Sequence, residues 1–502
     1  MLRKLILGGF CFLIGAGLAF FGMQFFLKTG FFKVPGKLII EGEVSNVEQY
    51  TKTLAEIELD KDMTISEYLS DKNITHKAVP TQDLVESVEE VEQAQDVDDA
   101  KYYLTDILVP VADFYEPKES ITGAEFEERL ASGEGVTSVL DLAETQKLLA
   151  VDGNYWLDDF TDGAKYKILK VEAETVGDMA NVTELLTPLM KEFPSSETVL
   201  SFTQTGVTAL GRNMYTKMAQ VGVGAYFSAN IAEYLRKFDL THTSNESSFS
   251  YYASVNNICS DWRFLDTLID IGLDIVELTG NHNIDCGAGD AISTFEKYQE
   301  LGIKTVGGGR TAEEAEIPLV ISQKGTNITM LAYNQSTGGA TLGATPGANQ
   351  YYAENAMARI AEAKERGDFV IVDVQYNECN FYDDVNENTY CDRADSAPGD
   401  QVGLFRSLID MGANIVVGTS AHQTQTYEQY NGGEIYYGLG NIFFDQVWWP
   451  GTTRSLGLTH YFWNGRLLQT RRFGTVYDTS YQTRVMNTEE IEWLINRLNQ
   501  AR

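Results

Sequence analysis

The chain has 502 residues, of which 43% are hydrophobic and 11% are aromatic. This composition is typical of folded globular proteins and excludes a disordered, collagen-like or coiled-coil chain, while the length predicts more than one folding unit. The 72 acidic and 38 basic residues give a net charge of −34. Because such a surface repels phosphate backbones, we expect no nucleic acid among its partners.

The first feature along the chain is an uncharged apolar run from Leu5 to Leu27, preceded by Arg3 and Lys4. A helix of this length rises roughly 34 Å, enough to cross a bilayer core of about 30 Å. A cleavable signal peptide usually has a shorter apolar core, of about 7–15 residues. Since basic flanks stay in the cytoplasm, we expect residues 1–35 to form a cytoplasmic tip and a single-pass membrane anchor, with the rest extracytoplasmic. A cleaved leader is the alternative.

Residues 36–198 form the next predicted domain, which is strongly acidic. Over residues 36–200, 37 acidic and 13 basic residues leave a net charge of −24, so most of the charge of the chain lies here. Acidic amphipathic stretches alternate with apolar runs typical of strands, such as residues 107–115 and 166–173. We therefore expect a folded α+β domain next to the membrane rather than a linker.

From about Val199 the pattern changes to short Val- and Ile-rich runs that alternate with helical segments, most of which end at glycine. This alternation predicts an α/β domain with buried strands over residues 199–480, followed by a C-terminal helix within residues 481–502. Two predicted hairpins interrupt it, at residues 318–334 and 426–441. Active sites in such folds lie at the carboxyl ends of strands, so the polar residues that follow each strand are the candidates.

Four of these strand-end loops carry groups that can act in catalysis or bind a metal ion. A single loop of this kind is more often structural, because Asn and Asp also cap helices and shape turns. The shared position of the four loops favours one common cleft. The groups are Asn245 and Glu246 in the first loop, Asn281, His282 and Asp285 in the second, Gln375 and Glu378 in the third, and Ser420 and His422 in the fourth.

Four cysteines lie beyond the apolar run, an even number that fits disulfides in an exported protein. Cys379 and Cys391 bracket a short polar loop, which a local disulfide would close. Cys259 and Cys286 are the pair left over. Free thiols are the alternative.

The order and spacing of these segments resemble the CapA family of capsule and poly-γ-glutamate synthesis proteins, whose domain is similar to calcineurin-like metallophosphoesterases. The resemblance covers roughly Val199–Phe473. It implies an α/β sandwich of two mixed sheets flanked by helices. The motifs that carry it are Thr205–Thr208, Ser244–Glu246, the loop Gly280–Gly287, Gln375–Glu378, the loop Gly418–Gln425 and the string Tyr437–Gln446.

The sequence departs from this family where metal would bind. Val207 stands where the family usually has Asp, and Gln375 and Ser420 stand where it usually has His. Glutamine and serine are poor ligands for a first-row divalent metal, so a dinuclear centre is not expected. Oxygen donors suit a single hard divalent cation, such as Mg²⁺ or Ca²⁺.

The resemblance and the residue types together suggest roles for the candidates. His282 is a candidate general acid, placed beside Asn281 and assisted by Asp285 or Glu246. The remaining candidates are metal ligands or binding groups. The candidate metal ligands are Asn245, Asn281, Glu378 and His422, and the candidate binding residues are Gln375, Ser420 and Asn441.

Three classes of function remain open at this point. The protein binds, guides or tethers a cell-surface polymer such as poly-γ-glutamate, it is a metal-dependent hydrolase of such a polymer, or it is a surface scaffold with a vestigial cleft. The lost ligands favour binding. A polyanion would be repelled by the acidic domain unless divalent cations bridged the carboxylates.

Overall fold

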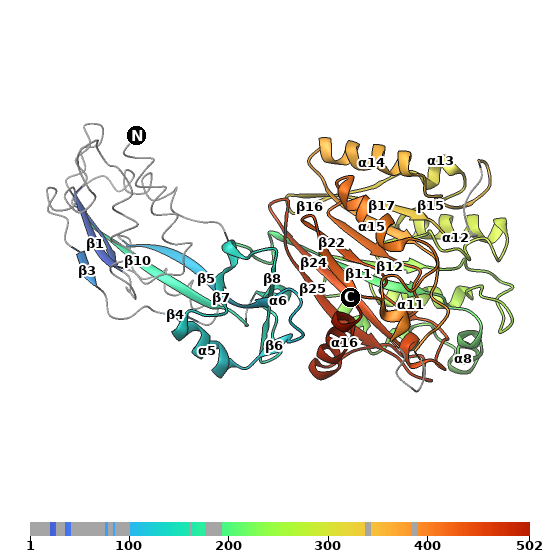
Figure 1. Cartoon of the computed structure of the whole chain (residues 1–502), viewed down its shortest axis with the longest axis horizontal. Coiled ribbons are helices and arrows are strands. Elements are labelled where there is room, and N and C mark those ends of the chain that lie inside the picture. The colour runs from blue at the N-terminus through green and yellow to red at the C-terminus, as the bar shows by residue number, and fades with distance from the viewer. Residues whose placement is uncertain are drawn as a thin grey trace. The chain divides into compact units, whose positions relative to one another are not determined.

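The computed structural model describes residues 101–160, 162–175, 193–336, 343–383 and 389–502, together with four strand segments nearer the amino terminus. These residues belong to two compact units (Figure 1). Unit 1 is Met1–Phe114 with Ser120–Ser195, and unit 2 is Tyr115–Glu119 with Ser196–Arg502. The short segment Tyr115–Glu119, expected in the acidic domain, thus belongs to the carboxyl-terminal unit.

Unit 1 is built on a largely antiparallel sheet in the order β3-β1-β2-β10-β5-β7, with β4 beside β10 and β8 beside β5. A helix, α5 (Gly123–Ser132), begins at the capping side chain of Thr122 and ends at Gly133, whose φ of 75° favours glycine. Its buried Phe126 packs with Leu149. The strands are β1 (Phe21–Phe26), β2 (Gly36–Glu41), β3 (His76–Ala78), β4 (Leu84–Val85), β5 (Lys101–Asp113), β7 (Val136–Ser138), β8 (Gln146–Leu148) and β10 (Lys165–Thr175).

The helix expected over Leu5–Leu27 is not confirmed. Phe21–Phe26 form β1, which pairs antiparallel with β2, and the rest of the apolar run lies outside the described residues. An extended strand rather than a helix is therefore what the structure has for the end of this run. Among the described residues, no helix combines the length and the apolar character needed to cross a membrane.

Unit 2 contains two large mixed sheets. The first has the order β14-β13-β12-β11-β24-β25-β26, with β23 also beside β11. Its strands β11 to β14 and β23 are parallel, and β24 to β26 are antiparallel. The strands are β11 (Val199–Thr208), β12 (Leu240–Asn245), β13 (Ile275–Glu277), β14 (Lys304–Val306), β23 (Asn441–Phe443), β24 (Arg454–Trp463), β25 (Arg466–Val476) and β26 (Arg484–Val485).

The second sheet has the order β16-β17-β19-β20-β22-β21. Both predicted hairpins are confirmed, because β16 pairs antiparallel with β17 and β21 with β22. The inner strands β17, β19, β20 and β22 are parallel neighbours. The strands are β16 (Leu319–Gln323), β17 (Thr326–Asn334), β19 (Phe369–Gln375), β20 (Ile415–Gly418), β21 (Tyr427–Tyr430) and β22 (Gly433–Tyr436).

Helices cover the outer face of each sheet. Against the first sheet, the apolar side chains of Ala291, Phe295 and Tyr298 recur at helical spacing along α12 and pack on Val276 and Leu278. Against the second sheet, helices α14 and α15 pack on alternate residues of β19 and β20. The helices of unit 2 include α8 (Asn213–Val221), α11 (Leu265–Asp270), α12 (Ala288–Glu300), α14 (Ala353–Glu365), α15 (Gln401–Asp410) and α16 (Thr488–Gln500).

The inner faces of the two sheets meet each other. Along β19, Val370, Val372 and Val374 point to the helices, so the alternating residue Asp373 points inward. Its carboxylate accepts a hydrogen bond of 3.1 Å from Gln204 of the first sheet. Unit 2 is therefore a mixed α/β domain with two facing sheets and helices outside.

Candidate metal centre

The strand ends bring the candidate loops together because parallel strands end at a common edge. Glu246 directly follows β12, and the loop that carries His282 follows β13. Gly280 opens that second loop against the backbone of Glu246. A Cβ atom on Gly280 would lie 2.6 Å from the carbonyl oxygen of Glu246, so only glycine allows this approach. Glu378 arrives from the second sheet, three residues after the end of β19.

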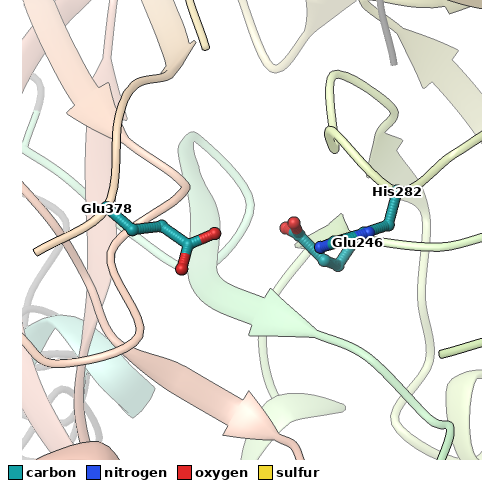
Figure 2. A group of neighbouring side chains, drawn as sticks. All are labelled: Glu246, His282 and Glu378. Atoms are coloured by element: carbon teal, nitrogen blue, oxygen red, sulfur yellow. The ribbon is translucent and has the colours of Figure 1, made fainter. Parts of the chain in front are cut away.

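Glu246, His282 and Glu378 converge on one point (Figure 2). Each offers one ligand atom, and these atoms lie within 4.8 Å of one another. Ligands of a divalent first-row metal lie about 2 Å from the ion, so such a group needs only a small contraction to share one. Two carboxylates and one imidazole are a donor set that fits a single cation of the Mn²⁺ or Zn²⁺ type.

Glu246 is fully buried, and its main neighbour is Gln375. The Nε2 atom of Gln375 lies 3.3 Å and 3.5 Å from the two carboxylate oxygens of Glu246 and donates to Asn281 Oδ1 at 3.0 Å. Burial raises the pKa of Glu246 to about 7, because removal from water disfavours the carboxylate. Glu246 therefore exchanges a proton near neutral pH when no cation is bound.

Glu378 behaves in the opposite way. Its Oε2 lies 3.4 Å from Nε2 of His422, and the Tyr382 hydroxyl donates to the same oxygen at 3.3 Å. Burial alone would raise the pKa of Glu378, but the charge and hydrogen bond of His422 lower it to about 2. The carboxylate in turn raises the pKa of His422 against the effect of burial. Asn441 orients that imidazole, with Oδ1 2.8 Å from Nδ1.

His282 is paired with Asp285 and is only partly buried. Its Nδ1 lies 2.6 Å from Oδ2 of Asp285, which leaves Nε2 for a cation or a substrate. A carboxylate on the second nitrogen fixes the orientation of the ring, as it does for many metal-binding histidines. The predicted assistance from Asp285 therefore has a geometric basis.

One buried oxygen atom beside this cluster, Oε1 of Gln375, lacks a hydrogen-bond partner within the described part of the chain. Buried polar atoms are normally satisfied by protein, water or an ion. An acceptor oxygen without a partner beside the carboxylate of Glu246 fits a site that takes up a cation with its water shell.

The structure thus brings most of the predicted residues together. Asn245 differs, since its amide nitrogen donates to the Tyr298 hydroxyl of α12, on the helix side of the sheet. Ser420 lies two residues before His422 in the chain. Within the described residues its hydroxyl makes no hydrogen bond to the cluster.

Sequence reasoning missed two features. Tyr382 binds Glu378, and its place inside the Cys379–Cys391 loop was the available signal. The second feature is a polar group between the sheets, where His242 Nε2 lies 3.2 Å from Asp373 Oδ2. The signal was Asp373, an ionisable residue within the largely apolar strand β19.

Comparisons with known proteins relate this chain to capsule synthesis proteins. The family model described as bacterial capsule synthesis protein PGA_cap matches residues 201–446. The PGA biosynthesis protein CapA of Bacillus subtilis (strain 168) is 26% identical over 285 residues, which cover 55% of this chain and 70% of that protein. The capsule biosynthesis protein CapA of Bacillus anthracis is 23% identical over 264 residues, covering 50% of this chain and 61% of that protein. A solved structure, TT1561 of Thermus thermophilus, has 11% identity and covers 58% of this chain and all of its own, with a TM-score of 0.23, too low to establish a shared fold.

Proposed function

Through residues 201–446 the chain belongs to the bacterial capsule synthesis protein family, and we propose that it binds an anionic surface polymer through a divalent cation held by Glu246, His282 and Glu378. The relatives named above are proteins of capsule and poly-γ-glutamate biosynthesis. The similarity to these relatives and the types of ligand in the cluster both favour a carboxylate polymer of the poly-γ-glutamate type as the partner.

One observation carries the proposal: three ligands from three loops meet at one point, and one of them is partly exposed. Three protein ligands leave coordination positions open, as in metal sites that admit a substrate. Carboxylates of a polymer are hard oxygen donors and would complete the shell of the cation.

The charge of the protein makes the cation necessary. With a net charge of −34 the chain repels a free polyanion. A cation shared between polymer and protein makes the local charge positive where the polymer contacts Glu246 and Glu378. Binding should therefore require the cation and should not occur by charge attraction alone.

The test measures Mn²⁺ and Zn²⁺ binding by calorimetry, followed by binding of poly-γ-glutamate with and without the cation. The wild-type protein should take up about one cation and bind the polymer only in its presence. Glu378→Gln should lose both properties. Glu300→Gln, at an exposed position paired with Lys297, is the matched control. Polymer binding that persists in a chelator would overturn the proposal.

A second candidate function is hydrolysis of the same polymer, and a specific observation favours it. Burial raises the pKa of Glu246 to about 7, while His422 holds the pKa of Glu378 at about 2. Two carboxylates with separated pKa values are typical of acid–base pairs in catalysis. In this second function the three side chains act on the polymer directly instead of holding a cation.

In this reading Glu246 accepts the proton of the attacking water, and His282, oriented by Asp285, donates a proton to the leaving group. His282→Ala should abolish release of new amine ends while changing the melting temperature little, since its side chain is partly exposed. Unchanged polymer length after long incubation with the wild-type protein would leave binding as the function.

We also propose that the protein is exported and acts outside the cell membrane. The support is the apolar run after Arg3 and Lys4 together with two disulfides, which persist in oxidising compartments.

A further inference from the structure

Both predicted disulfides are present, and both border the candidate metal centre. Cys379 directly follows Glu378 and is bonded to Cys391, 12 residues further on. Cys286 directly follows Asp285, the partner of His282, and is bonded to Cys259. The two bridges nevertheless hold their loops in different ways.

The far end of the Cys379–Cys391 bridge is firmly fixed. Cys391 is buried, and its neighbour Asp392 accepts hydrogen bonds of 2.6 Å from Gln423 and from Arg497 of α16. The backbone of Asp392 also accepts from the backbone of Thr426. Cys391 is therefore tied to the helix and strand framework of unit 2.

The near end, at Glu378, has few other attachments. Strand β19 ends at Gln375, and within the described part of the chain no backbone–backbone hydrogen bond involves residues 377–380. Asn377 donates through its side chain to Pro398. Further along, the ring of Tyr382 packs on Trp449, and the backbone of Asp383 donates to Gln423. The side chain of Glu378 itself contacts His422 and Tyr382, and the disulfide is the covalent link that ties its backbone to the framework.

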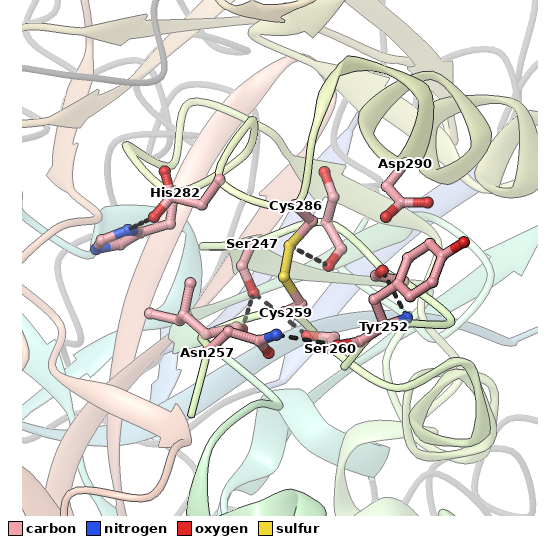
Figure 3. Close-up of a disulfide and its surroundings, with 12 residues drawn as sticks. Ser247, Tyr252, Asn257, Cys259, Ser260, His282, Cys286 and Asp290 are labelled. Atoms are coloured by element: carbon pink, nitrogen blue, oxygen red, sulfur yellow. Dashed lines mark hydrogen bonds and ion pairs between the residues drawn. A yellow bond between two sulfur atoms is a disulfide. The ribbon is translucent and has the colours of Figure 1, made fainter. Parts of the chain in front are cut away.

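The Cys259–Cys286 bridge is backed by hydrogen bonds that run beside it (Figure 3). Ser247 donates to Ile258, and Ser248 donates to the carbonyl oxygen of Asn283 in the loop of His282. The backbone of Ser260 donates to Ser248. Through Ser247 and Ser248 these contacts connect the segment of Cys259 with the segment of Cys286, so the loop of His282 has a second set of attachments.

We propose that the Cys379–Cys391 disulfide positions Glu378, so that the cation site forms only in a chain in which this bridge has been oxidised. Its formation converts two thiols to one disulfide, and two electrons and two protons pass to an oxidising disulfide of the thiol–disulfide oxidoreductase class. Both sulfurs are buried, so the bridge resists later reduction and records the compartment in which the chain folded. The inference rests on the proposed cation site.

Loop length makes the test discriminating. Cys259–Cys286 spans 27 residues and Cys379–Cys391 spans 12. Longer closed loops restrict the unfolded chain more, so losing the first bridge should lower the melting temperature more. If positioning matters, losing the second should weaken cation binding more. Stability and affinity should therefore follow opposite orders.

The experiment compares the full chain with Cys379→Ser/Cys391→Ser and, as matched control, Cys259→Ser/Cys286→Ser. Calorimetry with Mn²⁺ should show affinity reduced about tenfold to a hundredfold in the first variant, as for other outer-shell partners of metal ligands, and little changed in the second. An Ala pair at Cys379 and Cys391 replaces the Ser pair if that variant does not fold. Equal affinity in the wild type and the first variant would overturn the inference, as would equal losses in both variants.

Hydrogen exchange in cation-free protein gives a readout that does not depend on the metal. Exchange of residues 377–383 should increase in the Cys379→Ser/Cys391→Ser variant and stay at the wild-type level in the control, with strand β19 protected in both. If the wild type binds no Mn²⁺, the cation site itself fails, and the exchange pattern still decides whether the bridge positions Glu378. Unchanged exchange in the first variant would overturn the inference.

Discussion

Glu246 and Glu378 are acidic residues whose ligand atoms lie within 4.8 Å of each other. Their environments nevertheless shift their pKa values in opposite directions. Glu246 is removed from water and faces an amide, whereas Glu378 faces an imidazole. Burial disfavours the charged form of Glu246, and the ion pair with His422 favours the charged form of Glu378. The two carboxylates therefore make opposite predictions for stability in cation-free protein.

The first prediction concerns Glu246→Gln. A folded-state pKa raised from 4.5 to about 7 means that the contribution of Glu246 to stability is complete below pH 4.5 and is lost as the pH rises through 7. At about 1.4 kcal/mol per pKa unit, the penalty above pH 7 is about 3 kcal/mol. Glu246→Gln should therefore stabilise the cation-free protein at pH 8 and have little effect at pH 4. Urea unfolding of both proteins from pH 4 to pH 8, in a chelator, measures the difference in the free energy of unfolding. A loss of stability in Glu246→Gln at pH 8 would contradict the prediction.

The second prediction concerns Glu378→Gln, which should destabilise the protein at neutral pH where Glu246→Gln should stabilise it. The pKa of Glu378 is lowered to about 2, so its stabilising contribution is present above pH 4.5 and is lost as the pH falls toward 2. The substitution should lower the free energy of unfolding at pH 7, because it removes the partner of buried His422, and the difference should shrink in acid. Thermal unfolding from pH 7 to pH 3 tests this. Equal effects of both Gln substitutions at pH 7 would be incompatible with the two environments.

At the scale of elements, the approach of one strand end to the next assembles the cluster. A Cβ atom at Gly280 would lie 2.6 Å and 2.7 Å from backbone atoms of Glu246, and backbone cannot yield as a flexible side chain can. Gly280→Ala should push the loop of His282 away from Glu246 and abolish measurable Mn²⁺ binding. Gly289→Ala, early in α12 with nothing within 4 Å, is the matched control and should leave binding intact. Calorimetry measures the Mn²⁺ affinity of both variants. Wild-type affinity in Gly280→Ala would rule out this role for the glycine.

The elements themselves could be predicted to a large extent from the sequence. Runs of Val and Ile closed by turn residues identified β11, β13, β19 and β20, and the Asn-Gly-Gly turn identified the hairpin of β21 and β22. These signals are local, because residue spacing along the chain determines them. The strand-end rule then selected loops from which Glu246, His282 and Glu378 come together, since it depends only on strand direction.

What could not be predicted depends on contacts between distant parts of the chain. The pairing of β24 beside β11 joins residues more than 200 positions apart. Nothing local marks Tyr115, yet it stacks on Tyr427 and accepts a hydrogen bond from the backbone of Gln429, which places it in unit 2. Likewise, the facing of Asp373 and His242 follows from how two sheets pack, which spacing alone does not specify.

At the scale of the whole molecule, the apolar run and the disulfides point to the same compartment from independent chemistry. The run after Arg3 and Lys4 predicts an amino terminus in the cytoplasm and the rest outside. Disulfides between Cys259 and Cys286 and between Cys379 and Cys391 require an oxidising environment. Neither argument uses the other, so a single experiment can test their agreement.

The last prediction is that residues 28–502 are exposed outside the membrane with all four of these cysteines oxidised. Protease added to intact spheroplasts should digest both units, while a cytoplasmic marker protein survives. Alkylation before extraction, followed by mass mapping, should find Cys379 and Cys391 linked to each other and unmodified by the alkylating reagent. Protection from protease until lysis, together with four alkylated thiols, would assign the chain to the cytoplasm. Because the cation site is proposed to need the Cys379–Cys391 bridge, that outcome would also predict a protein purified without Mn²⁺ affinity, which calorimetry can check on the same sample.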